Sequence, residues 1–281
     1  NARLRRTSPI TQYATAAALE ALGPELDAVR AGTVRLGIVL TVMSGCVNYS
    51  RRFYDETLRD PATASPLVFP ETVFNAPASH IAALLGTKAI NYTLVGDPGT
   101  FLQGLALGAQ WIAQKQVDAC LVIGAEEMDW LGADAYRIFQ PNIVLSDGAG
   151  AIYLTGNATD IRLDQVSNAH LFLQHQNRHC AARKMRMELP CNMEDALLCD
   201  GTQNLPRLDA AENDAWHDWS GRRLAVKHVM GEGLMAASAW QCVAAIDALK
   251  HGQAQTGVVS IVGCNQQAIG AAFSTSPQFL R

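Results

Sequence analysis

Several features that would assign the chain to a common class of protein are missing from its sequence. It has no CxxC pair, no dense run of Lys and Arg, and no apolar run of the ~18 residues that a membrane helix needs. Only 17% of its residues are charged, and the formal net charge is -4. These absences argue against a zinc or disulfide scaffold, a membrane span and nucleic-acid binding. The seven scattered Cys, an odd number, are typical of reduced thiols in a cytoplasmic protein.

Apolar sequence, by contrast, is abundant: 49% of the 281 residues are hydrophobic, which is enough for a large core. Buried strands are expected where apolar residues run without alternation, at 34–42, 89–95, 119–124, 149–155, 161–168 and 258–264. Helices are expected over 9–22, 48–58, 101–116 and 237–250, and the polar segment 170–195 stays unassigned. The alternation of strands and helices predicts an α/β fold with parallel sheet. We expect two related halves, 1–155 and 156–281, within one unit.

The segment from Ala89 to Ala106 combines a buried strand, a sharp turn and an apolar helix. Its turn reads Gly96-Asp97-Pro98-Gly99. Enzymes use this layout to hold a nucleophile at a helix N-terminus, where backbone N–H groups and the helix dipole stabilise an anion. Pro98 stands where that nucleophile is expected, and it has neither a reactive side chain nor an N–H. Asp-Pro-Gly is also an ordinary turn sequence, so a plain turn is the alternative.

Four segments carry a resemblance to a known family, in the same order and at similar spacing. They are Met43-Ser-Gly, Phe74-Asn-Ala-Pro-Ala-Ser-His-Ile-Ala-Ala-Leu-Leu-Gly, Val117-Asp-Ala-Cys-Leu-Val-Ile-Gly-Ala-Glu and Leu145-Ser-Asp-Gly-Ala-Gly-Ala. Together they resemble the β-ketoacyl-acyl carrier protein synthases of the thiolase superfamily. The resemblance implies a thiolase-like α/β fold, a five-layer αβαβα sandwich. It also implies that this sequence is abbreviated at its N-terminus and shortened between Glu126 and Asp147.

By this resemblance, the catalytic Cys of the family falls on Pro98. The family's His-Gly-Thr-x-Thr looks like Asp200-Gly-Thr-Gln-Asn here, so Asp200 replaces a His while Thr202 is retained. The family's reaction needs a thiolate to attack the acyl thioester. It also needs neutral imidazoles that donate to the enolate oxygen created when malonyl loses CO2. A carboxylate at Asp200 presents the wrong charge to that oxygen.

The remaining family motifs are altered in the same way. Lys-x-x-x-Gly-His looks like Lys227-His-Val-Met-Gly-Glu, which retains Lys227 and puts Glu232 in place of the second His. The Gly-Phe-Gly-Gly gate looks like Gly263-Cys-Asn-Gln, with Cys264 in place of Phe. We expect Lys227 to form an ion pair with Glu232, a solvated Lys227 being the alternative. Cys199 and Cys264 are interpreted as small buried hydrophobes rather than substitute nucleophiles, because neither is expected beside a basic group.

The joint loss of these groups resembles the chain length factors, non-catalytic ketosynthase-like subunits of type II polyketide and aryl polyene systems. A compact factor of the aryl polyene type looks closer than the large aromatic-polyketide type. The resemblance implies a heterodimer with an active ketosynthase, with no activity of the chain alone. It implies no directly bound cofactor, and access to the phosphopantetheine of an acyl carrier protein through the partner. The alternatives are a divergent acyltransferase or malonyl decarboxylase using Asp200 or Glu232 as a base, and a homodimeric binding protein.

Three residues after the first strand are candidates for a tunnel wall. Cys46, Tyr49 and Phe53 follow one another at i, i+3 and i+7. The resemblance implies that bulky residues here line a tunnel at the dimer interface and limit acyl length, whereas plain helix core is the alternative. We expect no metal site. His170, His175 and His179 lack the intervening Glu or the Cys pair of known zinc motifs and are interpreted as surface residues.

Overall fold

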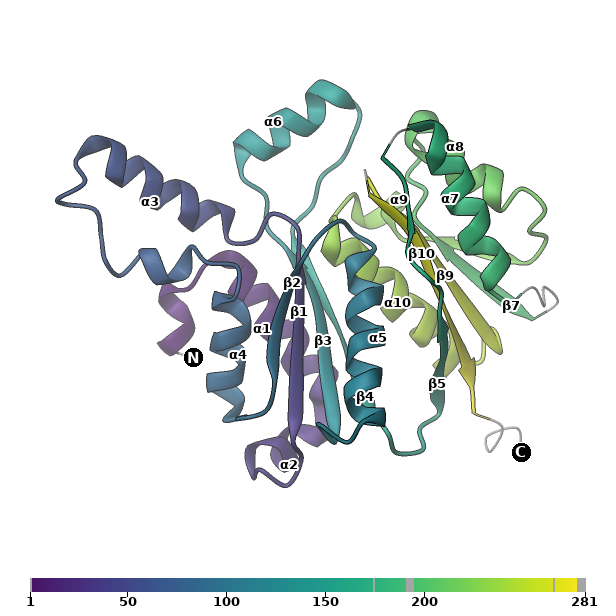
Figure 1. The fold of residues 1–281 in the computed structure, drawn as a ribbon, viewed down its shortest axis with the longest axis horizontal. Helices are drawn as coiled ribbons and strands as arrows, with labels where there is room; N and C mark the ends of the chain where they lie inside the picture. Colours follow the sequence, from purple (N-terminus) through teal and green to yellow (C-terminus); the bar gives the residue numbers. More distant parts are fainter. Residues whose placement is uncertain (1, 174, 191–194, 265, 277–281) are drawn as a thin grey trace.

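Two mixed sheets alternate with three layers of helices in the computed structural model, which describes residues 2–173, 175–190, 195–264 and 266–276 (Figure 1). The five layers run α1 and α4, the first sheet, α5 and α10, the second sheet, then α7 and α8. The first sheet and its outer helices come from the first half of the chain, and the second sheet comes from the second half. Short elements complete the order: η1 (Ala2–Arg6), η2 (Gly23–Glu25), α2 (Leu26–Arg30) and α9 (Lys227–Met230).

The first sheet has the strand order β2-β1-β3-β4. β1 is parallel to both neighbours and β4 is antiparallel to β3. Every residue of β1 and β3 is buried, because helices cover both faces, which explains why their sequences show no apolar–polar alternation. The elements are β1 (Leu36–Val42), β2 (Asn91–Val95), β3 (Ala119–Glu126), β4 (Gly148–Thr155), α1 (Pro9–Leu22), α4 (Ala76–Leu85), α5 (Thr100–Ala113) and α10 (Met235–Lys250).

The second sheet has the order β5-β10-β9-β7-β8, and β6 also pairs with β10. β7 is parallel to β8 and β9, whereas β10 is antiparallel to β5, β6 and β9. Segment 170–195, left unassigned by the sequence, contains a whole helix that packs Ala181, Ala182 and Met185 into the outer core. The elements are β5 (Ile161–Val166), β6 (His170–Leu171), β7 (Ala196–Asp200), β8 (Arg222–Ala225), β9 (Thr256–Val262), β10 (Gln267–Thr275), α7 (His175–Glu188) and α8 (Pro206–Ala215).

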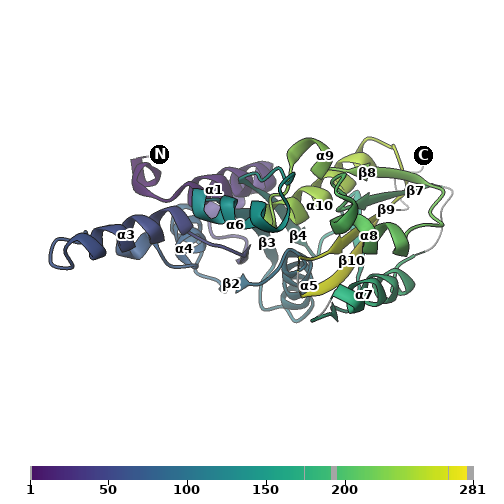
Figure 2. The same cartoon turned by 90° about the horizontal axis from the view of Figure 1, so that it is seen from above.

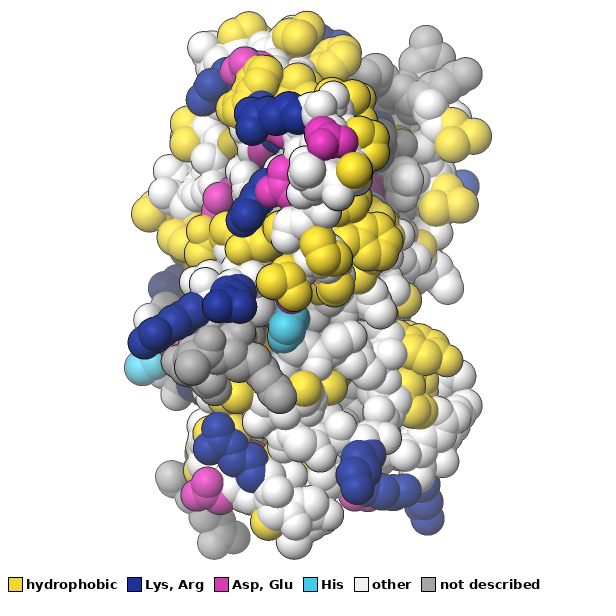
Figure 3. Space-filling model, turned by 90° about the vertical axis from the view of Figure 1, so that its left-hand side faces the viewer, with side chains coloured by type: hydrophobic (Ala, Val, Ile, Leu, Met, Phe, Trp, Pro, Cys, Tyr) yellow, Lys and Arg dark blue, Asp and Glu magenta, His cyan; other side chains and the backbone are white. Residues whose placement is uncertain are grey.

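Two excursions leave the layers and carry exposed apolar side chains. One comprises α3 (Val47–Arg59) and η3 (Phe69–Glu71), and α3 extends away from the sheets beyond α4 (Figure 2). The other contains α6 (Trp130–Phe139), where Ile138 and Phe139 are each 78% exposed. The side of the molecule where α3 lies shows hydrophobic side chains gathered over its upper part (Figure 3). Apolar patches of this kind mark surfaces that meet other molecules.

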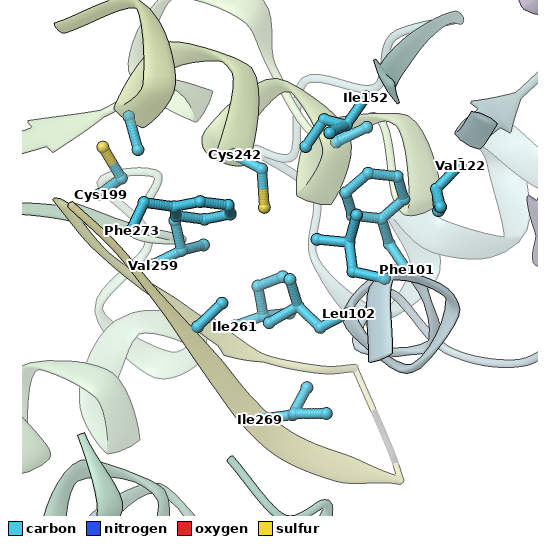
Figure 4. Close-up of a cluster of buried hydrophobic side chains, with 14 of the residues drawn as sticks. Phe101, Leu102, Val122, Ile152, Cys199, Cys242, Val259, Ile261, Ile269 and Phe273 are labelled. Carbon is cyan, nitrogen blue, oxygen red and sulfur yellow. The ribbon is translucent and has the colours of Figure 1, made fainter. Parts of the chain in front are cut away.

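The central core lies between the two sheets, around α5 and α10. Phe101 and Leu102 of α5 point into a cluster that includes Ile261 and Phe273 from the second sheet (Figure 4). α5 lies so close to the first sheet that a Cβ at position 108 would be 2.9 Å from the Sγ of Cys120. Gly108, which has no Cβ, allows this close approach. This packing fixes the N-terminus of α5, and with it the turn that contains Pro98.

Candidate functional site

The turn between β2 and α5 has the strand–turn–helix layout that the sequence predicts. β2 ends at Val95 and α5 begins at Thr100, so residues 96–99 make the whole connection. Pro98 is buried, and its carbonyl accepts a hydrogen bond of 3.3 Å from the N–H of Phe101 at the start of the helix. The elbow is therefore present, but Pro98 offers neither a nucleophilic side chain nor an N–H donor.

Asp97 ties the elbow to the second sheet, a role that the sequence reading missed. Its side chain is almost fully buried, and its Oδ1 accepts from the N–H of Gly99 at 3.1 Å and from Nε2 of Gln267 at 2.9 Å. Its Oδ2 accepts from the N–H of Gln267 at 3.2 Å. Burial raises the pKa of Asp97, while these hydrogen bonds oppose the rise. Gly263 has to lack a side chain, since a Cβ there would lie 1.9 Å from Oδ2.

Asp200 lies at the end of β7 and is neutralised by an arginine from the neighbouring strand. Nε and Nη2 of Arg223 each lie 2.8 Å from its Oδ2. Its Oδ1 accepts from the hydroxyl and from the N–H of Thr202. Asp200 is 1% exposed, and burial of a carboxylate costs least when its charge is paired and its oxygens are hydrogen-bonded. Both conditions are met within the chain.

Lys227 and Glu232 form the ion pair that the sequence predicts. Their Nζ and Oε2 atoms are 2.6 Å apart, and the two side chains are 9% and 5% exposed. The other oxygen of Glu232 accepts from the N–H of Leu234 at 2.8 Å. Burial alone would lower the pKa of Lys227, but attraction to Glu232 and the hydrogen bond to it leave this pKa raised. Lys227 thus neutralises the buried carboxylate of Glu232.

A third buried carboxyl, Glu212 of α8, lies between these two ion pairs. Its oxygens accept from the N–H of Gly201 at 3.1 Å and from the hydroxyl of Ser260. Burial, followed by repulsion from Asp200, raises the pKa of Glu212 to about 7. The sequence reading missed it because a Glu in a polar helical stretch gives no signal of burial.

Cys264 contributes to the same electrostatic environment. Burial, and then the charge of Glu232, raise the pKa of Cys264 to about 12, while the charge of Lys227 opposes the rise. Burial, with the charge of Asp200, likewise raises the pKa of Cys199 to about 12. Thiols with such pKa values are almost entirely protonated near pH 7, so neither Cys has the thiolate character of a nucleophile. Cys199 is buried and Cys264 half-buried, and their interpretation as small apolar groups stays a prediction.

The end of β3 supports the neighbouring loops through two buried glutamates. Glu126 accepts from the N–H groups of Met43 at 3.0 Å and Ser44 at 2.7 Å, just after β1. Glu127 accepts from the N–H of Ile10 at 2.8 Å and so holds the start of α1. Burial raises the pKa of Glu126 to about 7, although its backbone hydrogen bonds oppose the rise. The Gly-Ala-Glu ending of this strand therefore has a structural role here.

The three tunnel candidates lie at the start of α3. Cys46 is buried, and its Sγ lies 3.6 Å from both the hydroxyl of Ser8 and the carbonyl of Val73. Tyr49 is half-buried, and its hydroxyl donates to the carbonyl of Arg6 at 3.1 Å. The ring of Phe53 packs against that of Phe69 with centroids 5.4 Å apart. Their assignment to a tunnel wall stays a prediction.

The histidines of the polar segment pair with carboxylates. Nε2 of His170 lies 2.8 Å from Glu188, and Nδ1 of His179 lies 3.2 Å from Asp214. The side chain of His175 lies outside the described residues. Within the described ranges, no three His, Cys, Asp or Glu side chains gather as a metal site. Nor is any described helix long and apolar enough to cross a membrane.

Comparison with known proteins gives one partial relative by sequence. No protein-family model matches the chain. Over 114 residues it is 30% identical to a β-ketoacyl-[acyl-carrier-protein] synthase III of Trichormus variabilis. The match covers 38% of this chain and 34% of that synthase, so the chain spans about a third of the relative that it matches.

Solved structures match the chain over nearly its whole length. A β-ketoacyl synthase from Burkholderia phymatum has a TM-score of 0.80 at 15% identity, over 98% of this chain and 84% of that one. A complex of the ketosynthase ApeO with its chain length factor ApeC, from Xenorhabdus doucetiae, has a TM-score of 0.78 at 13% identity, over 96% and 82%. The ishigamide ketosynthase/chain length factor has a TM-score of 0.74 at 16% identity, over 86% and 73%. The chain therefore has the thiolase-like ketosynthase fold that its sequence predicts.

Proposed function

We propose that the chain is a non-catalytic subunit of the chain length factor type, which heterodimerises with an active ketosynthase in polyketide or aryl polyene biosynthesis. It would shape the acyl tunnel of that partner. The observation that carries the proposal is the tight turn between β2 and α5, where the resemblance puts Pro98 at the position of the nucleophile. A fold that keeps this turn without its reactive group retains the shape of a synthase and not its first chemical step.

The two replaced histidines strengthen the proposal. Decarboxylation of malonyl creates an enolate oxygen, which needs hydrogen-bond donors aimed at it. Asp200 and Glu232 instead engage their oxygens with Arg223 and Lys227. The same pairing argues against a divergent acyltransferase or malonyl decarboxylase, since a carboxylate that is held by a cation is a weak general base.

The outer edge of β2 offers a surface for the partner. β2 is the last strand of its sheet, and its exposed Tyr92 and Val95 are apolar. The edge strands of the second sheet are charged, with Arg162 and Asp164 in β5 and Arg222 in β8. Charged edges discourage pairing with another chain, whereas an uncharged edge with unpaired backbone groups favours it. We place the heterodimer interface at β2 and the adjoining α5.

The proposed subunit needs no cofactor of its own. The phosphopantetheine arm of the acyl carrier protein would deliver acyl groups to the partner's active site, and this chain would contribute wall residues. Tyr49 and Phe53 are the proposed limits on acyl length. Tyr49→Ala in the reconstituted complex is expected to lengthen the product, as mass spectrometry of released chains would report. An unchanged product distribution would remove Tyr49 from that role.

Co-expression with the active ketosynthase made by the same cells tests the heterodimer. We expect joint purification at one-to-one stoichiometry. Tyr92→Asp, which places a charge on the β2 edge, should abolish the complex. The matched control is Met187→Asp on α7, which also charges an exposed side chain but lies on the outer face of the second sheet. A chain that purifies alone, or a complex indifferent to Tyr92→Asp, would contradict the proposal.

A further inference from the structure

The two excursions that leave the layers hold more than half of the exposed large hydrophobic side chains. Among the described residues there are 21 such side chains, and eleven of them lie within 54–74 and 130–144. Leu67 is 74% exposed, and Ile138 and Phe139 are each 78% exposed. The eleven together expose on the order of 1,000 Å2, whereas the largest apolar patch of a typical monomer is about 300–600 Å2. These two segments, here called the excursion surface, are therefore too apolar for a surface that faces only water.

The helices of the excursion surface lack the packing that stabilises the other helices. α3 has 13 residues and α6 has 10, and neither helix, both of them fully described, contains a buried residue. By contrast, α4 and α8 also have 10 residues each, and they bury five and four of them. A helix of this length is marginal in water, because helical stability in proteins comes mainly from an apolar face packed on other elements. A surface that covers α3 and α6 is therefore expected.

Arg51 of α3 joins the two excursions. Its Nη1 lies 3.3 Å from Oδ2 of Asp129, and its guanidinium carbon lies 4.3 Å from the centroid of the Trp130 ring. Within the first excursion, the ring of Phe53 packs against that of Phe69 in η3. Hydrophobic side chains gather over the upper part of the side where α3 lies (Figure 3). A molecule that covers one excursion therefore also meets the other.

The excursion surface begins at the same end of the first sheet as the exposed Val95 of β2. β1 is parallel to β2 and to β3, so the carboxyl ends of the three strands lie at one end of the sheet. The first excursion follows β1, the second follows β3, and Val95 ends β2. β2 has only five residues, about 17 Å of strand, whereas each partner in a stable complex buries about 800 Å2. A partner on the β2 edge therefore needs further area, and the excursion surface can supply it.

Charge favours a neutral, apolar protein surface as the occupant. Segments 47–59 and 129–139 together contain four Arg and four Asp or Glu, so their net charge is zero. Arg52 pairs with Glu56 at 3.1 Å, and Arg137 pairs with Asp134 at 3.7 Å. Binding to an anionic membrane or to an acidic protein relies on an excess of cations, which is missing here. Large apolar interfaces are typical of subunits that stay associated.

We propose that the excursion surface packs on an apolar face of the second subunit and extends the contact made by the β2 edge. The inference rests on the proposed heterodimer, and it names the part of this chain that contributes most of the buried apolar area. Burial of that area favours association, because it removes apolar side chains from water. The same contact gives α3 and α6 the packing that they lack, so their backbone N–H groups open less often in the complex.

The test measures the dissociation constant of the complex with the co-purified ketosynthase for the double variant Ile138→Ser with Phe139→Ser. Each substitution removes a large apolar group from the contact, so we expect binding at least about tenfold weaker. The matched control is Met187→Ser, since Met187 is 82% exposed on α7, and it should change the constant less than about twofold. Both sites are already exposed, so each variant should melt at the temperature of the unmodified chain. Hydrogen exchange at α3 and α6 should be at least about tenfold slower in the complex than in the chain alone.

The outcomes separate this inference from the proposed function. Weaker binding of the double variant but not of Met187→Ser, with slower exchange at α3 and α6 in the complex, supports the inference. A complex that Tyr92→Asp abolishes and the double variant leaves unchanged keeps the heterodimer and overturns the inference. A chain that forms no complex overturns both.

Two other occupants of the excursion surface have their own signatures. Self-association of the chain that the double variant abolishes, with binding to the ketosynthase unchanged, would assign the surface to a second copy. Binding to vesicles of equimolar phosphatidylethanolamine and phosphatidylglycerol that the double variant abolishes, again with binding to the ketosynthase unchanged, would assign it to a membrane. Either result overturns the inference.

Discussion

The two halves of the candidate site satisfy their buried carboxylates in different ways. In the second half, Asp200 and Glu232 are each neutralised by a cation from the same chain. In the first half, Asp97 and Glu126 are held by N–H donors, and neither has an ion-pair partner among the described residues. Glu212, also in the second half, is the exception, because it is held by an N–H and a hydroxyl. The first half ends in the strand edge of β2, where Tyr92 and Val95 are exposed, and it is this edge that the proposed heterodimer would cover.

Removal of a cation from the second half should have the largest effect on stability. Lys227→Met leaves the carboxylate of Glu232 buried without its counter-charge, and we expect the free energy of unfolding to fall by about 3–5 kcal/mol. Urea unfolding measures the loss. The double variant Lys227→Met with Glu232→Gln should recover most of it, because no charge remains buried. A loss below about 1 kcal/mol for the single variant would show that the pair is solvated.

The pH dependence of stability tests the first half through Glu126. The pKa of Glu126 is about 7 in the folded chain and 4.5 in the unfolded chain. Between these two pH values the folded chain therefore binds more protons than the unfolded chain. Stability is therefore full below pH 4.5 and falls as pH rises toward 7, by about 3 kcal/mol for a shift of this size. Glu212, with the same pKa in the fold, adds to the fall.

Glu126→Gln should remove a large part of that slope in urea titrations between pH 4.5 and 8. Asp118→Asn serves as the control. Hydrogen bonds from Arg35 hold the pKa of Asp118 at about 2, so its contribution is lost only as pH falls below 3.8. A slope above pH 4.5 that Glu126→Gln leaves unchanged would contradict the account of this half.

A thiol at position 98, where the proposed function expects a lost nucleophile, should have the smallest effect. Pro98→Cys replaces a residue in a turn that packing already fixes, so we expect stability to change by about 1 kcal/mol or less. No condensation product should appear with acyl- and malonyl-carrier proteins, because Asp200 and Glu232 remain paired with their cations. Mass spectrometry of the carrier protein measures this. Formation of a β-ketoacyl product would show that only the elbow had lost its function.

The sequence predicted best what depends on neighbouring residues along the chain. The buried runs of β1 and β3 and the elbow around Pro98 needed only local apolar patterns and turn chemistry. The Lys227–Glu232 ion pair could also be predicted from the sequence, since the two residues are only five positions apart. Helix α7 was not predicted because its sequence is rich in Lys, Arg and His, and only a narrow stripe around Ala182 and Met185 is buried.

Contacts between distant segments could not be predicted. Arg223 meets Asp200 because β7 and β8 are adjacent parallel strands, and one sequence does not reveal that register. Asp97 looked like an ordinary turn residue until β10 brought Gln267 against it, 170 positions away in the sequence. The contact between Trp216 of the outer layer and Ser260 of β9 likewise joins residues 44 positions apart. Such contacts depend on the packing of distant segments, which has no local pattern.

Release of CO2 from malonyl-carrier protein by the purified chain tests the central claim most directly. Pro98 and the two neutralised carboxylates predict no release above the blank for the chain alone, and release when the active ketosynthase is added as its partner. Sustained release of CO2 by the chain without a partner would contradict the account of a non-catalytic subunit.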